Sequence, residues 1–190
     1  MSKTILFIDG ENFIHKLEDV IKERKLDKNK IDLAGIDFNK VFDKPLQDFK
    51  PDRKIFYAAK LRLHPDTVKK STELIKFQRK LRNTLVKQGF EFVIAGNVRG
   101  QMVSGKLIFK EKGVDVKIAV DMVSMACDKH IKTAILCSSD SDLQPAIKEA
   151  KGRGIQVIYL GFELIPNKGL TATTNRTILF RNSELADVLK

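Results

Sequence analysis

Hydrophobic residues along this chain form short runs that alternate with amphipathic stretches. The runs at 4–8, 54–59, 90–95, 132–137 and 155–160 contain many β-branched residues and have the length of buried strands. Such nearly continuous apolar runs are typical of parallel strands that are covered on both faces. The pattern therefore predicts an α/β fold, in which a mainly parallel central sheet forms the middle of a three-layer α/β/α sandwich.

Amphipathic stretches between these runs have the apolar spacing of helices. Helices are expected over 11–25, 37–46, 65–87, 114–126 and 143–151. The segment 96–112 interrupts this alternation, because its apolar residues stand between glycines and basic residues. It is expected to form a basic β-hairpin that is inserted into the fold.

The chain length and the last thirty residues bear on domain organisation. A chain of 190 residues fits a single domain with a core of its own. We therefore expect one domain over 1–190, with a core over about 4–161 and a C-terminal extension over 162–190 that packs on it. Within that extension, a short strand is expected at 178–180 and a helix from Ser183.

The side chains that follow the predicted strands suggest where chemistry takes place. In parallel α/β sheets, ligands bind beyond the carboxyl ends of the strands. Asp9 ends the first run, and Asp140 and Asp142 follow the run that ends at Cys137. If these strands are neighbours, three carboxylates converge, which is unfavourable unless a cation lies between them. Hard oxygen ligands favour Mg²⁺ or Mn²⁺ over zinc, and the chain has no cluster of Cys and His at zinc-ligand spacing.

Two acids in the helix over 114–126 are further candidates. Asp115 lies on the same helical face as Ile118 and Met122, which is an unusual place for a carboxylate. Its local alternative is a first-turn acid that interacts with the helix dipole. Asp121 lies beside Lys117 on the polar edge, either as an acid that supports the metal site or as an i,i+4 ion-pair partner.

Several polar residues near the strand ends have local structural alternatives of this kind. Asp9 and Gly10 are typical of a turn, and Asn12 is a candidate N-cap of the first helix. Ser139 or Asp140 would similarly cap the helix that follows them. Singly these interpretations are sufficient, but together they explain less well why four acids gather at strand ends in a basic protein.

Three segments with these acids resemble a known family. They are Phe7-Ile-Asp-Gly-Glu-Asn-Phe13, Lys112-Gly-Val-Asp-Val-Lys-Ile-Ala-Val-Asp-Met122 and Cys137-Ser-Ser-Asp-Ser-Asp-Leu143. They resemble the LabA-like branch of the NYN domain family, which belongs to the PIN-like nucleases. The resemblance covers about 4–161. It implies a parallel α/β/α sandwich with an acidic, metal-dependent ribonuclease centre that leaves a 5′-phosphate and a 3′-hydroxyl.

The resemblance also assigns roles by position. It matches the metal-site acids of the family to Asp9, Asp115, Asp140 and Asp142, and a further acid on the same helix to Asp121. It matches the polar residues near the site, which would contact the phosphate or a ligating carboxylate, to Asn12, Ser138 and Ser139.

Net charge suggests a polyanionic partner. The chain carries 35 Lys and Arg against 24 Asp and Glu, a formal charge of +11. Such an excess attracts nucleic acids, although a solvated lysine-rich surface has the same balance. Lys60 and Arg62 follow the second strand near the expected crevice, and Arg99 and Lys106 lie on the expected hairpin. We expect these four residues to contact RNA, with DNA open as an alternative substrate.

Cysteine usage and hydropathy bear on the compartment. Cys127 and Cys137 stand among apolar neighbours, which favours two reduced thiols over a disulfide. The first apolar run begins directly after residue 3, so a signal peptide is not expected. No window approaches the run of about 20 apolar residues that a membrane span requires. A cytoplasmic protein without a membrane partner is therefore expected, and a homo-oligomer is an open alternative.

Three other function classes compete with a ribonuclease. A non-catalytic RNA-binding or regulatory module would retain the acids without cleavage. A phosphotransferase of the haloacid-dehalogenase type requires an aspartate two residues after Asp9, where this chain has Glu11. A nucleotide-binding Rossmann protein requires a glycine-rich phosphate loop after the first strand, and this loop is missing. The ribonuclease is therefore the preferred hypothesis.

Overall fold

A central sheet of seven strands organises the protein. The computed structural model describes residues 3–103 and 106–190, with their side chains except those of 66, 99–103, 106–108 and 110. The strands are β1 (Lys3–Asp9), β2 (Arg53–Lys60), β3 (Glu91–Val103), β4 (Lys106–Lys112), β5 (Ile131–Cys137), β6 (Gln156–Phe162) and β7 (Arg176–Phe180). Their order in the sheet is β4-β3-β2-β1-β5-β6-β7. Neighbouring strands run parallel except for the antiparallel pair β3 and β4, which confirms the predicted fold class.

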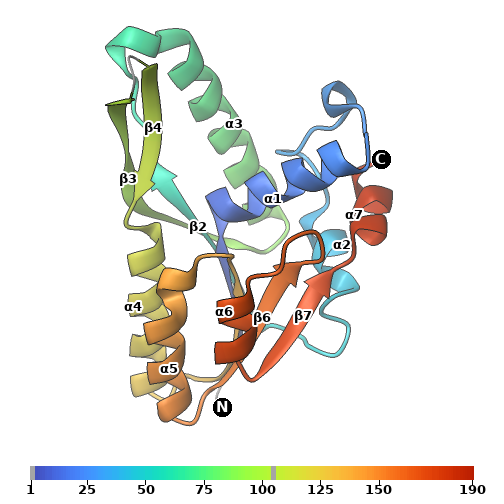
Figure 1. Cartoon of the computed structure of the whole chain (residues 1–190), viewed down its shortest axis with the longest axis vertical. Helices are drawn as coiled ribbons and strands as arrows, with labels where there is room; N and C mark the ends of the chain where they lie inside the picture. Colours follow the sequence, from blue (N-terminus) through green and yellow to red (C-terminus); the bar gives the residue numbers. More distant parts are fainter. Residues whose placement is uncertain (1–2, 104–105) are drawn as a thin grey trace.

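Helices cover both faces of this sheet (Figure 1). The α-helices are α1 (Gly10–Glu23), α2 (Phe38–Asp43), α3 (Val68–Lys87), α4 (Val114–Cys127), α5 (Gln144–Gly152), α6 (Lys168–Thr173) and α7 (Asn182–Leu189). Short 3₁₀ turns are η1 (Lys28–Lys30), η2 (Pro65–Thr67) and η3 (Ser141–Leu143). None of the helices in the described part of the chain combines the length and the apolar content that crossing a membrane requires.

Alternate side chains of the central strand contact two separate cores. Leu6 and Ile8 of β1 face a core that includes apolar residues of α1, α2, α3 and α7. Ile5 and Phe7 face the opposite core, which α4, α5 and α6 complete. Because successive residues of a strand point to opposite faces, both layers depend on β1. The end of β1, where Asp9 lies, is therefore fixed by packing on both sides of the sheet.

The predicted hairpin exists, but its first strand is continuous with the sheet. The sequence predicts a strand over 90–95 and a separate insertion over 96–112. In the structure, β3 runs through Gly96 without a break, and β4 returns antiparallel to it, with Val98 opposite Glu111. The two strands extend past the rest of the sheet beside α3 (Figure 1). The return of β4 brings the residues at its end back to the carboxyl ends of β1 and β2.

The C-terminal segment contributes to the sheet as well as to the core. The predicted short strand is β7, which pairs with β6, and the predicted helix is α7. Phe180 and Leu185 from this segment lie in the same core as Phe13 of α1. Sequence patterns did not indicate α6, because its six residues are too few to show a helical period.

Close packing at the start of α1 requires glycine at position 10. A Cβ atom added to Gly10 would overlap the ring of Phe56 and the carbonyl oxygen of Tyr57. The first turn of α1 therefore lies directly on β2, which fixes the direction in which the chain leaves Asp9.

Gly10→Ala is expected to lower the free energy of unfolding by about 1–3 kcal/mol, because the added methyl group overpacks a rigid contact. The measurement is chemical denaturation of the purified variant. Gly152→Ala is the matched control, since an added Cβ there meets no atom within 4 Å. It is expected to leave stability unchanged or to raise it by up to about 1 kcal/mol. Equal effects of the two substitutions would contradict the packing argument.

Candidate active site

Asp9 is a buried carboxylate at the junction of β1 and α1. It is 7% exposed, and its Oδ1 accepts a hydrogen bond of 3.2 Å from the backbone N–H of Asn12. Its Oδ2 accepts one of 3.0 Å from the hydroxyl of Ser138. Burial raises the pKa of Asp9, these two hydrogen bonds lower it, and the charges of Asp140 and Glu11 add to the increase. The net pKa is above the ordinary value, so a nearby cation would stabilise the ionised form.

The loop after β5 is tied to this junction by further hydrogen bonds. The backbone N–H of Ser139 donates to Asn12 Oδ1 over 3.1 Å, and that of Asp140 donates to Ser138 Oγ over 3.1 Å. Asp140 Oδ1 in turn accepts from the N–H of Asp142 at 2.9 Å. Because β1 and β5 are parallel neighbours, their carboxyl ends and the polar residues that follow them lie together.

Helix capping accounts for part of this arrangement. Asp9, rather than Asn12, is the N-cap of α1, and Asp140 is the N-cap of η3. A capping role does not exclude a role in a functional site. A capping carboxylate uses one lone pair of one oxygen, so its other lone pairs remain available to a ligand.

Asn167 is a further residue of this network that sequence patterns did not reveal. Its side-chain Nδ2 donates to the carbonyl oxygen of Ser139 over 2.8 Å, and its Oδ1 caps α6. Its backbone N–H donates to the hydroxyl of Tyr159. Asn167 therefore connects α6 to the loop that carries Asp140. The available signal was an N-cap residue, but the helix that it caps was itself not predicted.

Glu111 and Glu11 extend the acidic cluster beyond the predicted residues. Burial raises the pKa of Glu111 to about 9, together with a hydrogen bond to Glu11 and the charges of Glu11, Asp9 and Asp115. Two carboxyl groups share a hydrogen bond only when one of them holds a proton, so Glu111 is neutral at neutral pH. The position of Glu111 depends on the return of β4, whose register the sequence does not specify.

A tight corner brings Asp115 into the same region. Gly113 separates β4 from α4 and has a φ of +95°, a left-handed conformation that favours glycine. Glu111 and Asp115 lie on either side of this corner, and the charge of Asp115 contributes to the raised pKa of Glu111. The half-buried Asp115 is therefore part of the cluster as well as a first-turn acid of α4.

Asp121 and Asp142 lie differently from the other predicted acids. Asp121 accepts a hydrogen bond of 3.0 Å from the hydroxyl of Tyr57 and forms an ion pair with Lys117. Its charge acts on Tyr57 and Arg53 rather than on Asp9 or Glu111. The local alternative for Asp121, an i,i+4 partner of Lys117, is therefore what the structure has. Asp142 is exposed at the outer end of the loop after β5.

The donor set of the cluster is suited to a hard cation. The charges of Asp140 and Glu11 act on Asp9, and those of Glu11, Asp9 and Asp115 act on Glu111. A divalent ion would relieve that repulsion. Among the described residues, however, no three His, Cys, Asp or Glu side chains are already arranged around a common point as ligands. Ligation by three of these side chains would therefore require a different side-chain arrangement or bridging waters.

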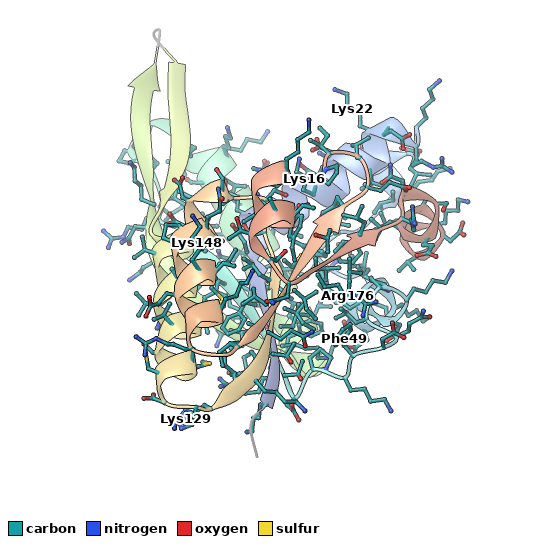
Figure 2. All side chains as sticks on the ribbon, turned by 60° about the horizontal axis from the view of Figure 1, so that its bottom comes forward. Lys16, Lys22, Phe49, Lys129, Lys148 and Arg176 are labelled. Atoms are coloured by element: carbon teal, nitrogen blue, oxygen red, sulfur yellow. The ribbon has the colours of Figure 1, made fainter. Side chains whose placement is uncertain are left out.

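Basic residues surround this site without forming one continuous surface. Lys60 is exposed at the end of β2, and Arg62 lines a hollow of about 170 Å³ just beyond it. Arg99 and Lys106 belong to β3 and β4, but their side chains lie outside the described ones. Other lysines, such as Lys22, lie on separate parts of the surface (Figure 2). The positive charge is thus widely distributed.

Glu111→Gln is expected to flatten the dependence of the melting temperature on pH. Because the pKa of Glu111 is raised, the folded wild type retains a proton that the unfolded chain releases. The stabilising contribution of this proton is complete below a pH of about 4.5 and is lost as the pH rises toward about 9. The amide has no proton to lose, so the variant should gain stability over wild type as pH rises. The measurement is thermal unfolding at closely spaced pH values across this interval.

Glu91→Gln is the control for that experiment. The guanidinium of Arg53 forms two hydrogen bonds with Glu91 and lowers the pKa of that carboxyl. The stability that this pair contributes is therefore lost only as pH falls toward the acid range. Glu91→Gln should lower the melting temperature by a similar amount across the whole interval. If Glu111→Gln gave the same parallel shift, the assignment of a protonated Glu111 would be wrong.

Comparisons with known proteins agree with this architecture. A crystal structure of a protein of unknown function, VPA0982 from Vibrio parahaemolyticus, superposes with a TM-score of 0.57 over 95% of this chain and 94% of that one. The two sequences are 16% identical, so this likeness shows the fold alone.

A curated relative and a family model relate the sequence more directly. The uncharacterized protein MJ0482 of Methanocaldococcus jannaschii is 36% identical over an alignment of 95 residues, and the match covers 44% of this chain and 39% of that protein. The chain thus matches less than half of the length of this relative. The model of the NYN domain matches residues 3–179, nearly the whole sequence, and extends past the region 4–161 that the motifs indicated. The chain belongs to the NYN domain family.

Proposed function

We propose that this protein is a metal-dependent ribonuclease that hydrolyses phosphodiester bonds at the acidic cluster. The observation that supports this proposal most is the electrostatic coupling of Asp9, Asp140, Asp115 and Glu111 at the strand ends of an NYN domain. Grouping acids in a protein of net charge +11 is unfavourable unless the group binds a cation. The net positive charge of the chain also suits a nucleic-acid substrate.

The residues of the site would divide the chemistry between them. Asp9 and Asp115, with Asp140 and Asp142, would hold Mg²⁺ or Mn²⁺, some directly and some through water. When bound, the metal supplies Lewis-acid stabilisation of the transition state and lowers the pKa of water. Ser138 holds Asp9 in one orientation through its hydroxyl, and Asn12 holds the backbone of Ser139. These contacts would keep the carboxylates in place while the charge of the substrate changes.

The proposed reaction is an in-line displacement by water. The water oxygen attacks phosphorus, and its proton passes to the carboxylate of Asp140 or Asp142. The bond from phosphorus to the 3′-oxygen breaks, and that oxygen takes a proton from solvent. The products are a 5′-phosphate and a 3′-hydroxyl. Lys60 and Arg62 would bind neighbouring phosphates of the RNA, since both are exposed near the strand ends.

Finer assignments belong to the same proposal. The three sequence motifs favour the LabA-like branch of the family, and the substrate is RNA, with DNA as an alternative. Cys127 and Cys137 are both free, which is consistent with the reducing cytoplasm that we propose as its compartment.

A non-catalytic RNA-binding module is the second candidate. The observation in its favour is that no three potential ligands among the described residues already surround one point. In that case the acids would serve capping and hydrogen bonding alone. Activity, rather than RNA binding, separates the two candidates.

Cleavage of labelled single-stranded and hairpin RNA tests the proposed activity. Wild type should cut RNA with Mn²⁺ or Mg²⁺ and should be inactive with EDTA. Asp9→Asn and Asp140→Asn should each reduce the rate by at least about a hundredfold, because each removes a charge that positions the metal. Asp19→Asn is a matched control, since Asp19 is an exposed acid of α1 away from the site. Intact RNA that is bound with either metal would favour the binding module instead.

Thermal unfolding with Mn²⁺ tests metal binding separately from activity. An ion that binds the folded state but not the unfolded chain raises the melting temperature by mass action. Wild type should therefore gain stability on addition of Mn²⁺, and Asp115→Asn should lose most of that gain. Asp121→Asn should keep it, because Asp121 contacts Tyr57 and Lys117 rather than the cluster. An equal loss in both variants would contradict the assigned ligand set.

A further inference from the structure

A groove between α1 and α3 opens next to the acidic cluster. It has a volume of about 540 Å³ and is floored by β2, where Phe56 and Ala58 face it. Ile14 of α1 and Phe77 of α3 contribute its side walls. We call this cavity the α1–α3 groove. Its volume falls in the range of about 300–1,000 Å³ that pockets for small organic groups have.

The lining of this groove combines apolar walls with a few polar groups. Besides the floor, Leu74 and the half-buried Phe109 provide apolar surface. The amide N–H donor of Gln78 is already used, since its Nε2 donates to the carbonyl oxygen of Ala59 over 2.8 Å. Its amide oxygen and the carboxylate of the exposed Glu73 are acceptors at the groove. A flat, partly apolar group that carries N–H donors at its edge suits such a lining.

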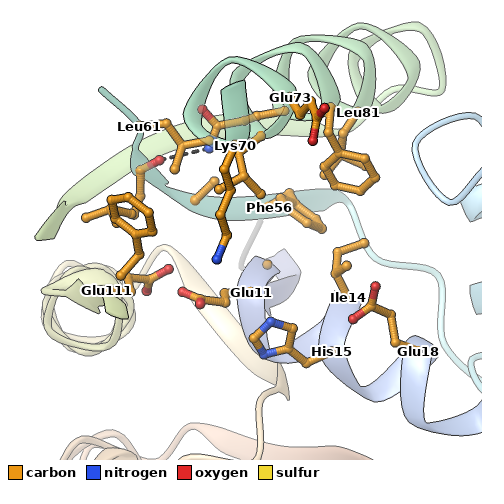
Figure 3. A pocket seen from close by; sticks show the side chains of 18 residues that line it. Glu11, Ile14, His15, Glu18, Phe56, Leu61, Lys70, Glu73, Leu81 and Glu111 are labelled. Carbon is orange, nitrogen blue, oxygen red and sulfur yellow. Dashed lines mark hydrogen bonds between the residues drawn. The ribbon is translucent and has the colours of Figure 1, made fainter. Parts of the chain in front are cut away.

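Two glutamates and a lysine connect the groove with the proposed site. Glu11 and Glu111 line one end of the groove and also belong to the acidic cluster. Lys70 of α3 lies at the same end, and Figure 3 shows its amino group pointing toward these two glutamates. This amino group also lies 5.6 Å from the centre of the Phe109 ring. A phosphate at the cluster would thus have a lysine on its groove side.

We propose that the α1–α3 groove binds one unpaired base of the RNA, next to the phosphate that is cleaved. The phosphate would pair with Lys70, and the base would lie between the apolar walls and donate to Gln78 and Glu73. A base reaches such a recess only when it is unpaired and turned out of a helix, so the groove selects single-stranded RNA. This inference rests on the proposed function, which supplies the phosphate at the cluster.

An apolar side chain of a protein partner fits the walls of the groove less completely. It would use neither the acceptors of Gln78 and Glu73 nor the positive charge of Lys70. A base with an exocyclic amino group and an attached phosphate uses all three groups, so these three side chains favour a nucleotide over an apolar side chain.

Filling the groove tests the proposal without damage to the core. Leu74 is 38% exposed and lines the groove, so Leu74→Trp should occupy it at little loss of stability. Val86→Trp is the matched control, because Val86 is 53% exposed on the same helix but does not line the groove. Both substitutions are made in the Asp140→Asn protein with Mg²⁺, so that the RNA stays intact during the binding measurement.

The probe is a short single-stranded RNA in which a single abasic site is moved along the sequence. With the Asp140→Asn protein, one abasic position should weaken binding about tenfold, and the other positions should have small effects. Leu74→Trp should bind the intact RNA as weakly as that abasic RNA, and Val86→Trp should match the parent. A duplex of the same sequence should bind more weakly than the single strand.

The outcomes separate this proposal from the proposed function. If wild type cleaves RNA but no abasic position affects binding, or if Leu74→Trp still discriminates against the abasic RNA, the groove proposal is wrong and the nuclease stands. Base-dependent binding without cleavage by wild type would reject the nuclease and support the groove. Binding of neither RNA would overturn both. Specific loss of binding to a protein partner in Leu74→Trp, with RNA binding unchanged, would point to the apolar alternative.

Discussion

The placement of one buried carboxylate determines how the strand ends of this protein come together. Asp9 ends the central strand, caps the helix that follows it and accepts a hydrogen bond from Ser138 on the neighbouring strand end. These contacts use both carboxylate oxygens and compensate part of the desolvation that burial causes. Without them, the loop after β5 would be connected to α1 only through the hydrogen bond from Ser139 to Asn12 among the side-chain contacts described above. The arrangement of the site therefore depends on a helix cap and on a hydrogen bond between neighbouring strand ends.

The acidic cluster opposes stability, and the rest of the fold must compensate for it. Glu111 is held in a place where its charge is unfavourable, so it retains a proton beside Glu11. Local arrangements that reduce stability are common where a protein binds or reacts, because a binding partner then relieves the strain. The tight packing of Gly10 on β2 fixes the start of α1 after Asp9, and the left-handed turn at Gly113 sets the direction of the chain between Glu111 and Asp115.

Sequence patterns located the site residues that directly follow the ends of parallel strands. They did not locate residues whose position depends on how two strands pair. Asp9 and Asp140 could be located because apolar runs reveal where parallel strands stop. Glu111 could not, since its position depends on the pairing of β4 with β3, and neither strand has a regular apolar alternation that would fix it. Asn167 was missed with the short helix that it caps. The role of Asp121 was left open, because a helical wheel shows its face but not its contact with Tyr57.

The separation of β1 and β5 along the chain affects when they pair during folding. Asp9 and Ser138 are separated by 129 positions, so their hydrogen bond closes most of the chain into a loop. Such long-range closure is entropically costly and forms slowly relative to local helices. The acids therefore stay dispersed while the chain is still emerging or partly folded. Their assembly into one cluster requires the pairing of β1 with β5, so an incompletely folded molecule would carry the net positive charge without the assembled acidic cluster.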